Sequence, residues 1–131
     1  MNIDKLAWIE IQDRKVLFVR TKGQELFYTP GGKREKDETD VEALARELKE
    51  ELSVKLIPDS ATFLHEFEGP AHNKPEGTMM HMRCFTARCE GMPQPSSEID
   101  ELTWLSSKDT EKTTVMGKTI LLWLKEQNLI D

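Results

Sequence analysis

Two runs of mainly apolar residues predict two β-strands near the start of the chain. The runs 6–11 and 15–20 are rich in β-branched and aromatic residues, and the polar residues 12–14 separate them, so we expect two strands joined by a short turn. The run 26–29 predicts a short third strand that stops at residues 30–32, because proline removes a backbone donor and glycine frees the backbone. Later strands are expected at 61–67, 79–88 and 101–105.

Apolar residues follow a helical period in the middle of the chain. Thr39 or Asp40 can cap a helix, and apolar residues then recur at the spacing of one helix face as far as Leu52. We expect this helix to end near Ser53, before Pro58. The apolar stripe consists of Val41, Leu44, Ala45, Leu48 and Leu52.

A second helix is predicted over residues 118–127. Ile120, Leu121 and Leu124 share one face, which we expect to point inward, and Trp123 is a further candidate for that face. Strands, a helix, more strands and a final helix together predict an α/β fold in which helices pack on a mixed sheet. With 131 residues, the chain is expected to form a single domain over residues 1–131.

The negative net charge of the chain argues against a nucleic acid polymer as its partner. The formal net charge is -6, whereas a protein that coats a nucleic acid polymer needs a basic surface, so we expect a small-molecule partner instead. No apolar run approaches the roughly 20 residues that span a bilayer, so no membrane partner is expected. The first residues lack the basic and then apolar layout of a secretory signal, and we therefore expect a cytoplasmic protein.

Much of the acidic charge lies between residues 35 and 51. On a helical wheel, Glu47, Glu50 and Glu51 fall on one flank, where like charges repel by roughly a few tenths of a kcal/mol per pair. A bound divalent cation would remove this repulsion, because hard cations prefer carboxylate oxygens. A solvated charged face is the ordinary alternative. The glycines at 31–32 favour a site, since glycine lets the backbone approach a ligand or present a carbonyl to a metal.

The segment from Gly32 to Val54 resembles the Nudix box, G-x5-E-x7-R-E-U-x-E-E-x-G-U, where U is an aliphatic residue. Every specified position matches except Ser53, which stands where the family usually has glycine. A serine there would cost about 1 kcal/mol if the backbone keeps a positive φ. Residues 98–105 also look like the family, so the resemblance covers nearly the whole chain. It implies a Nudix-like α/β/α sandwich with a central mixed β-sheet and the box on a loop-helix-loop.

The resemblance implies a role for each matched residue. Glu47, Glu50 and Glu51 look like the ligands of one or more Mg²⁺ ions, for which Mn²⁺ can substitute. The Gly31 carbonyl is a further candidate ligand. Arg46 resembles the arginine that orients a glutamate of the box through charge-assisted hydrogen bonds. Supporting positions next to these groups are implied for Gly32 and Glu38.

The resemblance also implies a base that activates a water molecule. Glu50 or Glu51 could serve within the box. In some members of the family the base lies on a later loop, where Glu98 and Glu101 are the candidates. For these two residues, an exposed position with no role in the reaction is an equally good interpretation.

Four residues outside the box carboxylates are candidates for substrate contacts. Arg20 and Lys33 would hold phosphates that the carboxylates alone repel, and Phe27 and Tyr28, beside the glycine turn, would meet a nucleobase. Exposed cations and packed aromatic rings are the alternatives. Among the histidines, only His72 lies in a predicted loop that could reach a substrate, although a packed or surface histidine is the more common case.

The box implies hydrolysis of a phosphoanhydride bond in a nucleoside diphosphate linked to another group, and it leaves the substrate open. The first interpretation is a MutT-type pyrophosphohydrolase of (deoxy)nucleoside triphosphates, which the compact chain favours. The second is an ADP-ribose or nucleotide-sugar pyrophosphatase, for which Gly69-Pro70 is weak support. A nucleotide-binding regulator without activity would be expected to lose box carboxylates, and all are present. Monomer and homodimer both remain open.

Overall fold

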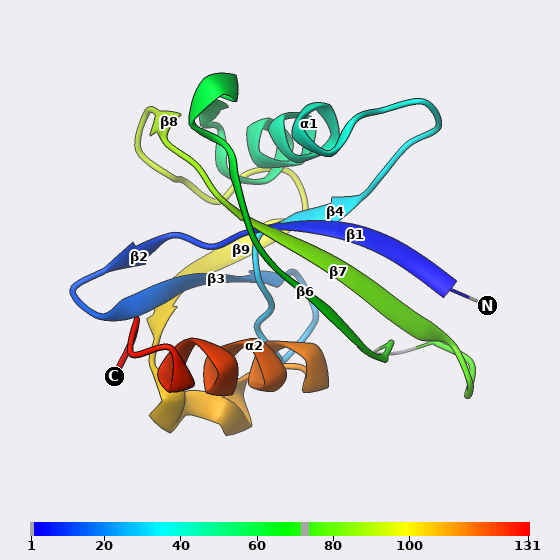
Figure 1. Ribbon diagram of the computed structural model, residues 1–131, viewed down its shortest axis with the longest axis vertical. Helices are drawn as coiled ribbons and strands as arrows, with labels where there is room; N and C mark the ends of the chain where they lie inside the picture. The colour runs from blue at the N-terminus through cyan, green and yellow to red at the C-terminus, as the bar shows by residue number, and fades with distance from the viewer. Residues whose placement is uncertain (1, 72–73) are drawn as a thin grey trace.

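Two helices lie on opposite sides of the strands in the computed structural model, which describes residues 2–71 and 74–131 (Figure 1). Helix α1 (Asp40–Leu52) lies above the strands in this view and helix α2 (Val115–Glu126) below them. Two short 3-10 helices are η1 (Pro58–Ser60) and η2 (Ser107–Lys112). The strands are β1 (Asn2–Trp8), β2 (Ile11–Gln12), β3 (Lys15–Thr21), β4 (Gly31–Lys33), β5 (Lys55–Leu56), β6 (Thr62–Pro70), β7 (Met79–Thr86), β8 (Cys89–Glu90) and β9 (Ile99–Leu105).

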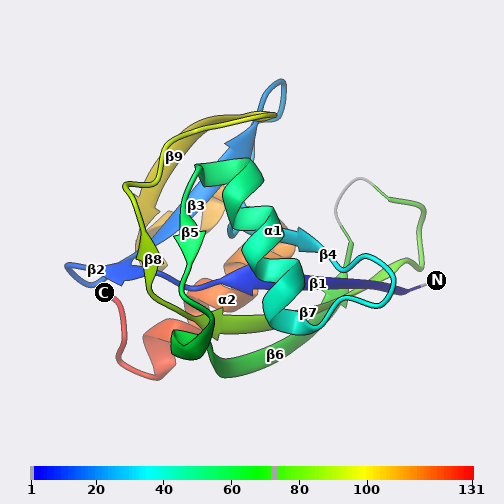
Figure 2. The same ribbon diagram turned by 90° about the horizontal axis from the view of Figure 1, so that it is seen from above.

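The largest sheet is mixed, as the order of the elements predicts. Its strand order is β4-β1-β7-β6, in which β1 and β7 run parallel and the other pairs antiparallel. β2, β3 and β9 form an antiparallel sheet, and β5 pairs with β8. Seen from above, α1 crosses the region of β1 and β4 (Figure 2). The predicted α/β/α sandwich with a central mixed sheet is therefore confirmed.

The first strands are placed differently from the prediction. The run 6–11 does not form one strand, because β1 begins at Asn2 and ends at Trp8, and only residues 11–12 form a hairpin with β3. β1 pairs with β4 and β7 instead. These pairings join distant parts of the chain, and no local pattern of residues reports them.

The predicted strand at 26–29 is wrong. Phe27 and Tyr28 form only single bridges, and the regular strand β4 begins at Gly31, where the pattern predicts an end. Gly31 has a φ of 137°, and a Cβ there would collide with the Leu6 carbonyl. The absence of a side chain therefore allows β4 to lie close against β1, so glycine here permits a strand and does not break one.

Helix α1 has the predicted ends. Thr39 is its N-cap, and the Thr39 hydroxyl accepts from the Glu42 backbone N–H at 3.1 Å while the Glu42 carboxylate accepts from the Thr39 N–H at 2.9 Å. This capping box satisfies two donors that the helix leaves free. Ser53 ends the helix with a φ of 56°, so the serine does adopt the left-handed conformation that favours glycine.

Two apolar cores lie on the two sides of the strands. Leu44, Leu48 and Leu52 of α1 are fully buried in one of them, as the helical stripe predicts. Each such side chain contributes about 1.5–3 kcal/mol through removal from water. The second core lies under α2. Packing in the first core holds α1 on the strands, and the acidic side of the helix contacts β4 through Glu47 and Glu51, which lie against Gly32 and Gly31.

Helix α2 begins three residues earlier than predicted, at Val115, because the Thr114 hydroxyl accepts from the Gly117 backbone N–H at 3.2 Å and caps it. Its inward face is confirmed, since the predicted apolar residues are buried, and the ring of Trp123 stacks on that of His65 with centroids 4.2 Å apart. No helix in the described part of the chain is long and apolar enough to cross a bilayer. The inward residues are Ile120, Leu121 and Leu124.

We expect Gly31→Ala to lower the free energy of unfolding by about 3 kcal/mol or more, because the new Cβ overlaps the Leu6 carbonyl and separates β4 from β1. Gly23→Ala is the matched control: Gly23 also has a positive φ, of 83°, but has no atom within 4 Å of a new Cβ. That control should cost only about 1–2 kcal/mol of backbone strain. Denaturant unfolding measures both, and equal losses would contradict the close approach.

Candidate active site

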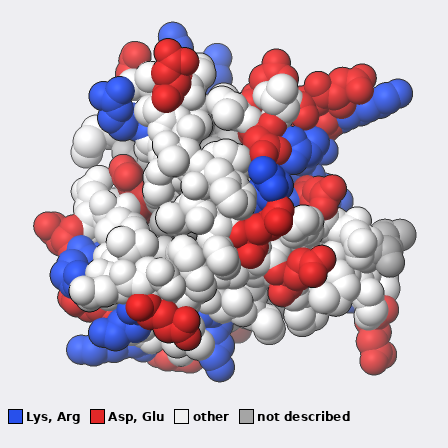
Figure 3. Space-filling view, in the orientation of Figure 1, with Lys and Arg blue, Asp and Glu red and all other residues white. Residues whose placement is uncertain are grey.

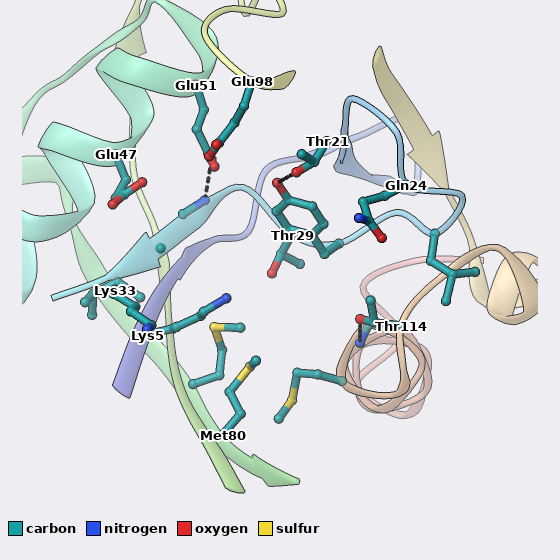
Figure 4. Close-up of a pocket in the computed structure, with 18 of the residues that line it drawn as sticks. Lys5, Thr21, Gln24, Thr29, Lys33, Glu47, Glu51, Met80, Glu98 and Thr114 are labelled. Carbon is teal, nitrogen blue, oxygen red and sulfur yellow. Dashed lines mark hydrogen bonds between the residues drawn. The ribbon is translucent and has the colours of Figure 1, made fainter. Parts of the chain in front are cut away.

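A pocket of about 480 Å³ lies among β1, β4, β7 and residues of both helices. One end of the pocket is acidic, and the other is lined mainly by apolar groups (Figure 4). A single cavity therefore combines carboxylates at one end with apolar side chains at the other. The acidic residues are Glu47, Glu51 and Glu98, and the methionines of the apolar end are Met80, Met82 and Met116.

Glu51 is the most buried carboxylate of the site, with only 4% of its surface exposed. The Gly31 backbone N–H donates to its Oε1 at 2.9 Å. Burial raises the pKa of Glu51 to about 8, and the charges of Glu47 and Glu98 act in the same direction, whereas the Gly31 hydrogen bond opposes them. In the protein alone, the acidic end is therefore short of positive charge.

Arg46 holds the second carboxylate of the pocket. Its Nη1 donates to Glu47 Oε1 at 2.8 Å, and its Nε and Nη2 donate to the two oxygens of Glu38 at 2.8 and 2.9 Å. Nη2 also donates to the Lys33 carbonyl at 2.9 Å. The two bonds from Arg46, together with the one from the Glu35 backbone N–H, lower the pKa of Glu38 to about 2. Burial raises the pKa of Glu47, which packs so tightly on Gly32 that a Cβ there would lie 2.5 Å from the Glu47 carboxyl carbon.

Glu98 enters the pocket from a loop that is bonded to the end of α1. The Gln94 N–H donates to the Leu52 carbonyl and the Ser96 N–H to the Glu51 carbonyl, both at 2.9 Å. The hydroxyls of Ser53 and Ser96 are 2.6 Å apart and share a hydrogen bond. The residue that departs from the box thus contacts the loop that carries Glu98. Figure 4 shows Glu51 and Glu98 reaching the same end of the cavity from these two elements.

Several predicted site residues lie outside the lining of this pocket. Glu50 is exposed, with its carboxylate 3.8 Å from Arg46. Arg20 pairs with Asp100 at 3.3 Å and with Glu101 at 2.6 Å, and its guanidinium lies over the ring of Phe27. Lys33 and Tyr28 do line the pocket. His72 is outside the described residues. The roles expected for all of these residues stay predictions.

The pocket also contains residues that no motif indicated. Lys5 extends from β1 into the cavity beside the methionines, and burial together with the nearby charge of Lys33 lowers its pKa (Figure 4). One signal was present in the sequence: Lys5 interrupts the alternating apolar residues Ile3 and Ala7. The methionines gave no signal, because the same residues serve equally well as ordinary core.

Comparison with known proteins now identifies the family. Residues 6–124 match the NUDIX domain. The chain belongs to the Nudix family. No match is found among curated proteins.

Solved structures of Nudix proteins have the same fold. E. coli ORF135 is 24% identical over 96% of this chain and 89% of its own, with a TM-score of 0.73. MutT from Methanosarcina mazei Go1 is 17% identical over 97% of this chain and 95% of its own, with a TM-score of 0.76. A UDP-X diphosphatase is 20% identical over 98% of this chain and 64% of its own, with a TM-score of 0.69. At these identities, the likeness concerns the fold alone.

As a Nudix protein the chain is a hydrolase of phosphoanhydrides, and the family generally uses divalent metals such as Mg²⁺. The donors at the acidic end of the pocket, carboxylate oxygens beside a glycine backbone, are those that a hard cation prefers. No group of three such side chains in the described part of the chain is already arranged to hold an ion. The Gly31 N–H and the Arg46 guanidinium each bond one oxygen of these carboxylates, Glu51 Oε1 and Glu47 Oε1.

We expect the stability of the metal-free protein to fall as the pH rises through the range between 4.5 and about 8, the ordinary and folded pKa values of Glu51. In that range the folded protein keeps a proton that the unfolded chain has released, so rising pH favours unfolding. In Glu51→Gln the free energy of unfolding should vary less with pH. The variant should gain most stability over the wild type above the folded pKa of Glu51. Denaturant unfolding of both proteins in EDTA, repeated across the pH range, measures how the free energy of unfolding depends on pH.

The exposed Glu25 gives the control for this experiment, since Glu25→Gln removes the same charge from a solvated position. Its pH profile should run parallel to that of the wild type. A Glu51→Gln profile that is also parallel would show that Glu51 does not carry the proton.

Proposed function

We propose that this Nudix hydrolase is a Mg²⁺-dependent pyrophosphohydrolase of (deoxy)nucleoside triphosphates, of the MutT type. The observation that carries the proposal is the two-ended pocket. Its acidic end suits a metal-bound phosphate chain, and its apolar end suits the flat rings of a nucleobase. The size of the cavity, about 480 Å³, is in the range of small-molecule sites. We propose that residues 1–131 act as one unit.

In this proposal, Glu47, Glu51 and the Gly31 carbonyl would hold the ion, and Glu50 would be a further ligand on the exposed side. When bound there, Mg²⁺ would offset the phosphate charge and lower the pKa of a bound water. Arg46 keeps Glu47 in place, with Gly32 and Glu38 as its supports.

The chain's own residues then bind and orient the substrate. Lys33, at the rim of the acidic end, binds phosphate oxygens, and Tyr28 lines the route toward the base. A water attacks phosphorus, passes its proton to a carboxylate, and the anhydride P–O bond breaks to give a monophosphate and pyrophosphate. Glu98 is better placed than Glu101 to accept that proton, since Glu98 lines the pocket and Glu101 pairs with Arg20.

A nucleotide-sugar or ADP-ribose pyrophosphatase is the second candidate. Pro70, the residue that favoured this interpretation, lines the pocket, and the UDP-X diphosphatase has the same fold. The similarity in fold to MutT from Methanosarcina mazei Go1 supports the first candidate in the same way. A regulator without activity is the weakest candidate, because every carboxylate of the box is present.

The surface agrees with a small-molecule substrate better than with a nucleic acid polymer. On the face drawn in Figure 3, the described lysines and arginines are interspersed with acidic side chains and form no continuous basic stripe. We propose the cytoplasm as the compartment, where nucleoside triphosphates are at hand, and either a monomer or a homodimer as the working form.

The test is a substrate panel with Mg²⁺, containing canonical and oxidised deoxynucleoside triphosphates, CTP, ADP-ribose, nucleotide sugars and dinucleoside polyphosphates, with products separated by chromatography. We expect turnover of triphosphates to monophosphate and pyrophosphate. Glu50→Gln and Glu51→Gln should each reduce kcat by about a hundredfold or more, and the exposed Glu25→Gln should not. Near wild-type rates in both box variants would contradict the assignment of the carboxylates, and nucleotide binding without turnover would favour a regulator.

A further inference from the structure

The charged side chain of Lys5 lies within the apolar face that β1 and β7 present. Residues 3, 5 and 7 of β1 point to the same face, because side chains alternate along a strand. Ile3 and Ala7 are buried there, whereas Lys5 lies between them. The neighbours of Lys5 across β7 continue the apolar face, since Met80, Met82 and Cys84 are all buried in the core under α2. The sheet alone would be more stable with an apolar residue at this position.

Lys5 also faces a second cation. It is the register partner of Lys33 on the neighbouring strand β4, and like charges directly opposite each other destabilise a sheet. Among the described residues, no carboxylate lies within ion-pair distance of the Lys5 ammonium, although the charges of Glu47 and Glu51 act on it from farther away. A partly buried cation without a direct partner is costly, so its position calls for an anion that the folded chain does not supply.

We propose that Lys5 is a substrate-binding residue whose ammonium donates to a phosphoryl oxygen, so that Lys5 and Lys33 together clamp the phosphate chain from the sheet side of the pocket. The side chain of Lys5 lies between the acidic end and the methionines, on the side opposite the carboxylates of α1 and the Glu98 loop (Figure 4). A polyphosphate between them would contact positive charge on both sides, from the lysines and from the metal of the proposed function, on which this inference rests for the identity of the substrate.

The experiment measures binding of inorganic pyrophosphate in the presence of Mg²⁺ by calorimetry, because this probe has no base. Lys5→Met, which restores the apolar pattern of the sheet, should raise the Kd for pyrophosphate about tenfold or more and raise the KM of the substrate by a similar factor. Lys5→Arg keeps the charge and should bind within about threefold of the wild type. The control is Lys15→Met at an exposed position of β3, which should leave both constants unchanged.

Stability separates this role from a structural one. We expect Lys5→Met to have a Tm at or above that of the wild type, since it removes an unpaired charge and a like-charge contact. Lys5→Gln is the second variant, in case the methionine variant does not fold, and it should also weaken pyrophosphate binding. An unchanged Kd for pyrophosphate in a folded Lys5 variant would overturn the proposal. Weaker binding of nucleotide with unchanged binding of pyrophosphate would also overturn it, by assigning Lys5 to the base.

The outcomes for Lys5 and for the proposed function remain distinguishable. If the wild type cleaves no nucleotide of the panel but its pyrophosphate binding depends on Lys5, the proposed function fails and the phosphate clamp stands. If the wild type cleaves triphosphates and Lys5→Met matches it in both Kd and KM, the clamp fails and the function stands.

Discussion

The guanidinium of Arg46 joins three parts of the chain that the candidate site needs in one place. It donates to the Glu38 carboxylate from the loop after β4, to the Glu47 carboxylate on α1, and to the Lys33 carbonyl at the end of β4. A planar fork of donors suits this task, because its directions are fixed and its charge does not titrate. Without it, Glu47 would be a partly buried carboxylate packed on Gly32 that lacks the close ion pair it now makes with Arg46. The acidic end of the pocket therefore depends on a cation that is not in the pocket lining.

Much of the fold could be predicted wherever the determinants are local. Helix α1 follows from a cap at Thr39 and an apolar stripe that ends at Leu52, all within a few turns of chain. The position of β4 could not be predicted, because Gly31 breaks a strand in one context and permits a close strand contact in another. The difference lies in the Leu6 carbonyl, which the chain brings there from a distant segment. The parallel pairing of β1 with β7 could not be predicted either, because β7 also comes from a distant segment of the chain.

Some residues of the candidate site could also be predicted from the sequence, and others could not. Glu47 and Glu51 could be found from their helical spacing and from the box, and they do share one pocket. Arg20 could not be placed, since its choice of Asp100 and Glu101 as partners depends on the register of β3 with β9. The methionines of the apolar end come from two elements, β7 and α2, and they resemble any core residue in sequence. Lys5 lies outside the predicted strand 6–11, so its place on the apolar face of β1 required the pairing of β1 with β7.

The loop that carries Glu98 has a consequence for how the site opens. Its amides at Gln94 and Ser96 donate to the last carbonyls of α1, and Ser53, at the left-handed end of that helix, adds a hydroxyl bond. The two segments that bring Glu51 and Glu98 together thus separate only if these bonds break as a group. Exchange of the Gln94 and Ser96 amide protons with solvent deuterium therefore reports on local opening of the acidic end, independently of turnover.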